Sequence, residues 1–294
     1  MCIMDRFIRS WHIFRRVQSL LADRSTLAAF PAVSFCVMAA VLLSLIAPAV
    51  SLLDLSVSEG RIVCGQCGDR AETDLTLAVL SLILYAVATL TANFCSAAFY
   101  SEIFRCLKGE REASIARGFR FAAGRLVPLI LWSLLSSTVG VILRMLSGRN
   151  GRSWLFKPLW FAWAVASCFA IPVLVADPAL VNPFRALKRS GSVINRTWGE
   201  ALIGFAGLKV LLWAGFAAWI LLLFGLWAGF RTWPACLPVF IAAACGGTIL
   251  FGLFAYMIGA ADTVYRATLF LYAEEGIFPD GFDSDDLNGA FIRE

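Results

Sequence analysis

The sequence predicts an all-α integral membrane protein: a bundle of six transmembrane helices with amphipathic interfacial helices on its cytoplasmic side. Hydrophobic residues make up 60% of the 294 residues and charged residues only 15%, whereas soluble domains contain about 45–50% and about 25%. The mean hydropathy of +0.79 also excludes an intrinsically disordered chain, because disorder requires low hydrophobicity. Several long stretches without charges supply the predicted spans.

Six stretches are long and apolar enough to cross a hydrocarbon core about 30 Å thick. They lie within a predicted membrane domain of residues 25–273 and cover residues 27–53, 75–101, 126–143, 158–176, 201–230 and 232–262. The fifth contains a single charged residue, Lys209. An acidic tail, residues 274–294, follows the membrane domain.

The distribution of Lys and Arg predicts how the chain is oriented. With the N-terminus in the cytoplasm, the inside segments hold 17 Lys and Arg residues and the outside segments hold 7. We therefore expect a multi-pass protein of the plasma membrane with both termini in the cytoplasm.

Three segments have the pattern of helices that lie on a membrane surface. Residues 1–24 place aromatic and basic side chains on opposite faces, and residues 112–125 repeat this pattern over a shorter length. A third helix is predicted to start at Asn182 and Pro183, since Asn is a good N-cap and Pro suits the first helical position. All three are expected on the cytoplasmic side, where anionic lipids attract basic faces.

The densest basic cluster beside a span is a candidate contact for lipid headgroups. It consists of Arg185, Lys188, Arg189 and Arg196. These residues could recognise headgroups, or they could serve only to set the topology, and the two interpretations are compatible.

Cys64 and Cys67 form a CxxC pair in the first predicted outside loop. The pair fits a structural disulfide or an idle pair, a thiol-exchange site, or half of a metal site shared between subunits. The chain has one histidine, His12, and no second CxxC pair, so no metal site within one chain is predicted.

Lys209 is a charged residue inside a predicted span and is therefore a candidate functional residue. Its long side chain could reach the membrane surface, or it could pair with Asp262 or Asp177. A substrate site built on Lys209 and Asp262 is the third interpretation.

Several short stretches resemble a prokaryotic family of multi-pass membrane proteins known only as a domain of unknown function. They are Ser10-Trp11, residues 137–144, 171–175, 183–190, 197–200 and 271–273, Phe278-Pro279 and Gly281-Phe282. The pairing of Ala-Leu-Lys-Arg-Ser with Trp-Gly-Glu is the most specific part. More distantly, the pattern is similar to the membrane domain attached to some glycerophosphoryl diester phosphodiesterases, which has no known catalytic residues of its own. The resemblance implies a six-span fold and no activity, and the CxxC pair does not belong to its pattern.

We therefore expect a non-enzymatic membrane module that binds lipid or a protein partner and contributes to membrane homeostasis. Its expected partners are anionic lipids of the cytoplasmic leaflet, with a second copy or another membrane protein as a further option, and no nucleic acid, cofactor or metal. One alternative is a small-solute transporter that uses Lys209 and Asp262. Another is extracytoplasmic thiol exchange at Cys64 and Cys67.

Overall fold

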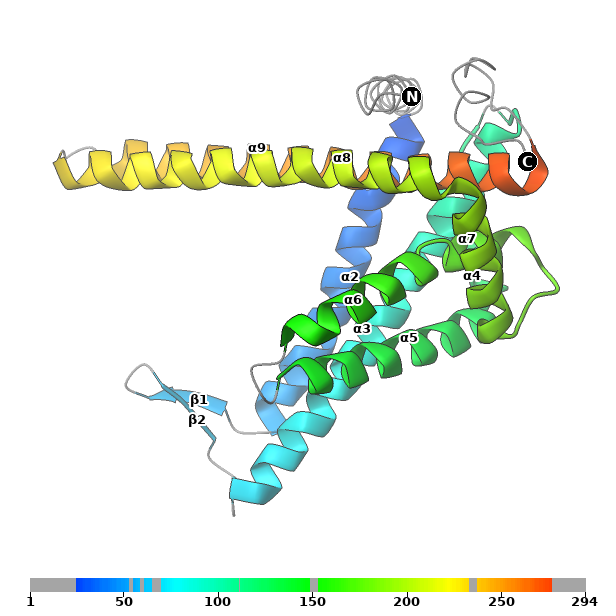
Figure 1. The fold of residues 1–294 in the computed structure, drawn as a ribbon. Coiled ribbons are helices and arrows are strands. Elements are labelled where there is room, and N and C mark those ends of the chain that lie inside the picture. Colours follow the sequence, from blue (N-terminus) through cyan, green and yellow to red (C-terminus); the bar gives the residue numbers. More distant parts are fainter. Residues whose placement is uncertain are drawn as a thin grey trace. The chain divides into compact units, whose positions relative to one another are not determined.

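The computed structural model describes residues 25–52, 55–58, 61–64, 70–110, 112–148, 153–232 and 237–276. Helices dominate these residues, as predicted (Figure 1). The helices are α2 (Ser25–Leu52), α3 (Arg70–Leu107), α4 (Ile115–Ala123), α5 (Leu126–Gly148), α6 (Ser153–Ser167), α7 (Ala170–Ala176), α8 (Pro183–Thr232) and α9 (Leu237–Glu275).

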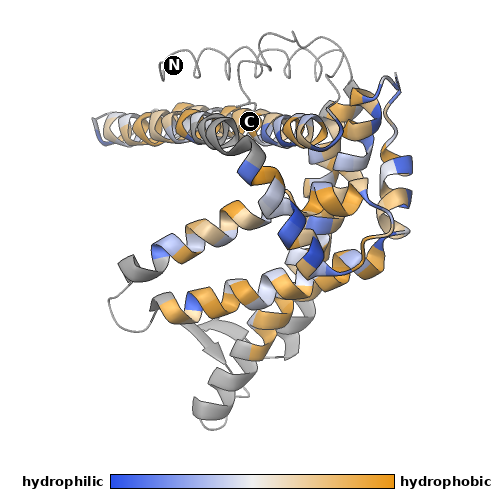
Figure 2. Cartoon of the chain, turned by 45° about the vertical axis from the view of Figure 1, so that its right-hand side comes forward, coloured by the Kyte–Doolittle hydropathy of each residue, from blue (hydrophilic) through white to orange (hydrophobic). Residues whose placement is uncertain are grey.

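Five of the described helical segments are long and apolar enough to cross a membrane (Figure 2). They are Val79–Leu107, Leu126–Leu146, Lys157–Ala176, Gly207–Thr232 and Pro238–Glu275. They correspond to the second to sixth predicted spans. The first predicted span contains a shorter apolar helix, Ala29–Leu45, within α2. The described residues thus support a membrane protein with five candidate spans.

A short β-hairpin between α2 and α3 departs from the all-α prediction. Strands β1 (Leu55–Ser58) and β2 (Arg61–Cys64) pair antiparallel, with Leu55 opposite Cys64 and Ser58 opposite Arg61. Strand β1 alternates apolar residues with serines, and β2 contains the adjacent β-branched residues Ile62 and Val63, which favour a strand over a helix.

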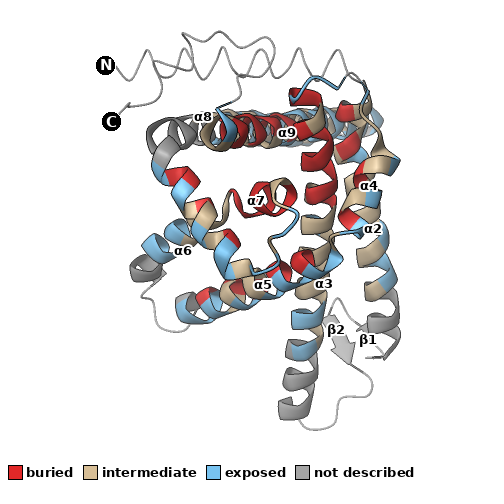
Figure 3. Cartoon of the chain, turned by 90° about the vertical axis from the view of Figure 1, so that its right-hand side faces the viewer, coloured by how far each residue is buried: buried red, intermediate tan, exposed pale blue. Residues whose placement is uncertain are grey.

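The chain forms two compact units, each described by itself. The α4 unit comprises Ala29–Glu102 and Ser114–Ser192. The α9 unit comprises Met1–Ala28, Ile103–Ala113 and Val193–Glu294. Buried residues are concentrated in the C-terminal part of α3, in α7 and in the C-terminal part of α9 (Figure 3).

The fourth predicted span is broken into α6 and α7, which corrects the prediction of one helix over residues 158–176. Pro172 has no N–H to donate to the carbonyl of Cys168, and its ring crowds that carbonyl. The fully buried Ser190 bridges the break: its hydroxyl donates to the Ala166 carbonyl (2.6 Å) and accepts the Phe169 N–H (3.1 Å). Backbone groups exposed by the break therefore regain partners without water.

Helix α8 begins at the predicted cap but is longer than predicted. The Asn182 side-chain oxygen accepts the N–H groups of Phe184 (2.9 Å) and Arg185 (3.4 Å), which confirms the N-cap. The predicted surface helix and the fifth span are one helix of 50 residues, about 75 Å long at 1.5 Å per residue. The two elements are continuous because no proline interrupts the sequence between Pro183 and Thr232.

In the α9 unit, α8 and α9 pack through layers that pair a glycine with a large side chain. The contacts join Gly215 to Phe254, Gly247 to Leu222 and Gly229 to Phe240. Each layer lies seven residues from the next on both helices, which is the repeat of coiled-coil packing. A Cβ atom at Gly247 would lie 2.5 Å from Leu222 Cδ2, so the glycines allow the two helices to approach closely.

Candidate functional site

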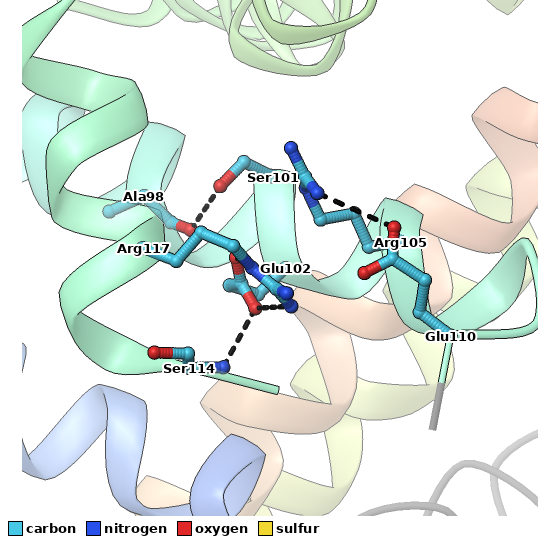
Figure 4. A network of polar contacts seen from close by, with 7 residues as sticks. All are labelled: Ala98, Ser101, Glu102, Arg105, Glu110, Ser114 and Arg117. Carbon is cyan, nitrogen blue, oxygen red and sulfur yellow. Dashed lines mark hydrogen bonds and ion pairs between the residues drawn. The ribbon is translucent and has the colours of Figure 1, made fainter. Parts of the chain in front are cut away.

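The α4 unit holds a buried carboxylate near the C-terminal end of α3. Glu102 has 0% of its surface exposed. Its Oε1 accepts Arg117 Nε (2.8 Å), and its Oε2 accepts both Arg117 Nη2 (2.7 Å) and the Ser114 N–H (2.8 Å; Figure 4). This bidentate arrangement is the strong form of a charged hydrogen bond. These three hydrogen bonds hold the N-terminal end of α4 against α3.

Helix α4 packs tightly against α2 and against the face of α3 that bears Glu102. A Cβ atom at Gly118 would lie 2.7 Å from the Ala98 carbonyl oxygen and 2.7 Å from Phe30 Cζ. Phe119 stacks on Phe30 (5.9 Å between ring centroids) and contacts Phe94 (5.8 Å). Phe119, which is partly buried, packs against these two rings because the glycine lets α4 approach α3.

A second polar cluster fixes the loop between α7 and α8, residues 177–182. Asp177 Oδ2 accepts Arg189 Nη1 (2.8 Å) and Oδ1 accepts the Ala179 N–H (3.0 Å). Arg125, in the turn between α4 and α5, donates Nη1 to the Pro178 carbonyl (3.0 Å). The loop is therefore held by arginines from two other elements.

This contact uses only part of the hydrogen-bonding capacity of the Arg125 guanidinium. Its Nη2 is buried and has no hydrogen-bond partner among the described residues. Burial lowers the pKa of its guanidinium, and the nearby charge of Asp177 opposes this shift. The arginine nevertheless stays charged at neutral pH, because its pKa begins far above 7.

The predicted headgroup residues divide into two groups. Arg185 and Lys188 are exposed and form no ion pair with any described residue. Arg189 is committed to Asp177 instead. The side chain of Arg196 lies outside the described residues. Arg120, on the exposed face of α4, resembles the first group.

Lys209 and Asp262 are not joined as an ion pair. If the seven-residue register of α8 and α9 continues by one repeat beyond Gly215 and Phe254, Leu208 lies opposite Ala261 and Lys209 lies near the level of Asp262. Lys209 is exposed, however, and the Asp262 carboxylate binds Arg266 one turn further along α9 (2.7 Å). Asp262 pairs with Arg266 rather than with Lys209 because residues four apart on one helix are already neighbours, whereas a pair with Lys209 would join two helices. Asp177, the other proposed partner, binds Arg189.

The remaining sequence candidates lie partly or wholly outside the described residues. Cys64 ends β2, but its side chain and all of Cys67 lie outside them, as do residues 1–24, for which a surface helix was predicted, and residues 277–294. The first two residues of the predicted tail, Glu274 and Glu275, belong to α9. Within the described part of the chain, no three His, Cys, Asp or Glu residues gather where they could hold a metal ion.

The Glu102–Arg117 pair was missed by the sequence interpretation. In the sequence, Glu102 directly follows an uncharged stretch, and Arg117 is one of several cations in the segment after it. Their pairing depends on the chain reversing after α3, where Gly109 has a φ of 99° and the Glu110 N–H bonds the Arg105 carbonyl (3.0 Å). The Gly-Glu that follows Lys108 is the signal that could have indicated the reversal.

Comparison with known proteins identifies a family and no activity. No curated protein and no solved structure matches the chain. Nothing links it to the glycerophosphoryl diester phosphodiesterases that the sequence distantly resembles. The pattern of a family of unknown function, DUF6159, matches residues 75–280, which include Glu102, Arg117, the 177–182 loop and all of α8 but not Cys64 or Cys67. The chain therefore belongs to the DUF6159 family of unknown function.

Proposed function

We propose that the chain is a non-enzymatic, six-span protein of the plasma membrane that binds anionic lipid headgroups on its cytoplasmic side and supports membrane homeostasis. The observation that carries the proposal is the division of the basic residues. Arg117 and Arg189 are held in ion pairs, whereas Arg185 and Lys188 are exposed and have no acidic partner among the described residues. Exposed cations next to a span are attracted to an anionic leaflet.

Charged residues bracket apolar segments whose lengths match a bilayer. Lys209 and Arg231 are 22 residues apart in α8, about 33 Å along a helix. Arg125 and Arg144 are 19 residues apart, about 28 Å. The outer arginines lie over aromatic rings, Arg231 over Trp227 (4.5 Å) and Arg144 over Tyr85 (5.6 Å). Such aromatic and basic pairs are typical of membrane interfaces. Lys209 then lies at the cytoplasmic boundary, where its side chain reaches the headgroups.

Helix α2 would be the first span in chain order and would bring the number of spans from five to six. It is a helix of 28 residues with no charged residue, about 42 Å long and sufficient to cross the membrane. Its Phe30 stacks on Phe99 of α3 (5.2 Å), so the N-terminal part of α2 meets the C-terminal part of α3, as expected for antiparallel neighbours.

A reporter fused to the C-terminal end of the chain tests this topology. Six spans and a cytoplasmic N-terminus place the C-terminal end in the cytoplasm as well. A reporter that is active only in the cytoplasm should therefore be active when it is fused to that end. The same reporter fused within the loop between α2 and α3 should be inactive. Activity with the opposite pattern would contradict the six-span arrangement.

Removing the two exposed cations should weaken lipid binding. An Arg185→Gln/Lys188→Gln variant is expected to lose about 2 kcal/mol of binding free energy for phosphatidylglycerol, or roughly 30-fold in affinity. Affinity is measured from the rise in melting temperature of the detergent-purified protein as lipid is added, with neutral phosphatidylcholine as the reference lipid.

The matched control removes two cations at the opposite boundary. An Arg144→Gln/Arg231→Gln variant loses the same charge but should bind phosphatidylglycerol as the unaltered protein does. Equal losses in the two variants would mean that net charge alone governs binding. No loss in the first variant would contradict the proposed role of Arg185 and Lys188.

Other functions gain no specific support. A transporter built on Lys209 and Asp262 would need the two side chains to share a path, but Asp262 binds Arg266. Thiol exchange at Cys64 and Cys67 and assembly with a second copy or another membrane protein stay as proposals that no described contact favours.

A further inference from the structure

We propose that Arg125 and the loop of residues 177–182 form a site for one phosphate group, carried by the headgroup of an anionic phospholipid. The inference rests on the proposed lipid-binding function and adds a defined site and a residue to it. The exposed cations Arg185 and Lys188 then attract anionic lipid, and Arg125 holds the phosphate itself.

Arg125 supplies the donors for such a group. One guanidinium nitrogen, Nη1, is taken by the Pro178 carbonyl (3.0 Å). The other, Nη2, is buried and has no partner among the described residues. Buried donors in proteins almost always have an acceptor. A planar guanidinium with free N–H groups matches the oxygens of phosphate. Partial burial also lowers the pKa of this guanidinium, so an anion beside it would be favourable.

The loop beside Arg125 is held in place before any ligand binds. Asp177 accepts Arg189 Nη1 (2.8 Å) and the Ala179 N–H (3.0 Å), so both of its carboxylate oxygens are engaged. At the other end, Asn182 caps α8 through the Phe184 N–H (2.9 Å). A site fixed in this way loses little conformational entropy on binding.

The charge around the loop favours an anion. Residues 118–125 and 177–192 contain five cations and one carboxylate, that of Asp177. The cations are Arg120, Arg125, Arg185, Lys188 and Arg189. Since Arg189 neutralises Asp177, the field of the other four is not opposed by an acid in these two segments.

An Arg125→Lys variant tests the site without changing charge. A lysine keeps the positive charge and one donor for Pro178, but it lacks the fork that serves two acceptors at once. We expect its affinity for phosphatidylglycerol to fall about tenfold, because hydrogen bonds to a charged group are lost. Arg144→Lys, at the other end of α5, is the matched control and should bind as the unaltered protein does. Melting of both variants in neutral detergent shows that each is folded.

A second measurement on the unaltered protein does not depend on the variant. Amide hydrogen exchange of Ala179 and Leu180 should slow when phosphatidylglycerol is added and should not respond to phosphatidylcholine. Slowing by inorganic phosphate alone would also support a phosphate site and would identify free phosphate as a source of the ligand.

Two results would overturn the site. One is an Arg125→Lys protein that binds phosphatidylglycerol with unchanged affinity. The other is loop amide exchange that does not respond to phosphatidylglycerol or to inorganic phosphate. If Arg185→Gln/Lys188→Gln still weakens binding while either result is found, the lipid-binding function stands and only the Arg125 site fails.

Discussion

An Arg117→Ala variant is expected to lose about 3 kcal/mol or more of its free energy of unfolding, because it leaves a charged carboxylate buried without its partner. Glu102 has no exposed surface and depends on Arg117 for two of its three hydrogen bonds. Its remaining donor is the Ser114 N–H. The measurement is the unfolding free energy of the detergent-purified protein from chemical denaturation.

An exposed arginine nearby provides the control. Arg105 pairs with Glu110 at 3.4 Å, and both side chains are more than 40% exposed. An exposed pair of this kind contributes only about 0–1 kcal/mol, so Arg105→Ala should have little effect. Similar losses in Arg117→Ala and Arg105→Ala would contradict the structural role of the buried pair.

A Gly118→Ala variant should be destabilised by about 2 kcal/mol, even though alanine favours helices over glycine. The added methyl would meet the Ala98 backbone carbonyl at 2.7 Å and Phe30 Cζ at 2.7 Å. The backbone of α3 cannot yield as a flexible side chain would, so α4 would have to move away. That movement would also stretch the bonds between Glu102 and Arg117. Thermal unfolding in detergent measures the loss.

Gly191 is the matched glycine for this prediction. It lies within α8, and a Cβ atom there would have no neighbour within 4 Å. Gly191→Ala should therefore leave stability unchanged or raise it by about 0.4–1 kcal/mol. If Gly118→Ala raised stability in the same way, the close packing of α4 on α3 would be wrong.

The sequence predicts the features that depend on neighbouring residues. Membrane spans are recognised from local hydrophobicity alone, so five of the six predicted spans have counterparts among the described helices. The start of α8 is predicted because Asn182 and Pro183 act on the adjacent turn. The break before Ala170 was missed, although Pro172 signals it, because the hydrophobicity of the span continues through it.

The candidate site is less predictable because its contacts join distant residues. Arg117 and Arg189 appear in the sequence as two more cations of an inside loop, no different from Arg185. Only the fold shows that the first two bind Glu102 and Asp177 and that Arg185 does not. The orphaned Nη2 of Arg125 likewise results from burial, which a residue list does not show.

The proposed function depends on the binding of anionic phospholipid by the exposed cations Arg185 and Lys188. Native mass spectrometry of the protein, purified in mild detergent from the membrane in which it is made, tests it most directly. We predict a species that retains phospholipid of an anionic class, and that this species is depleted in Arg185→Gln/Lys188→Gln but not in Arg144→Gln/Arg231→Gln. A chain that carries no lipid, or that retains neutral and anionic lipids in the proportions of the membrane, would rule out selective binding of anionic phospholipid.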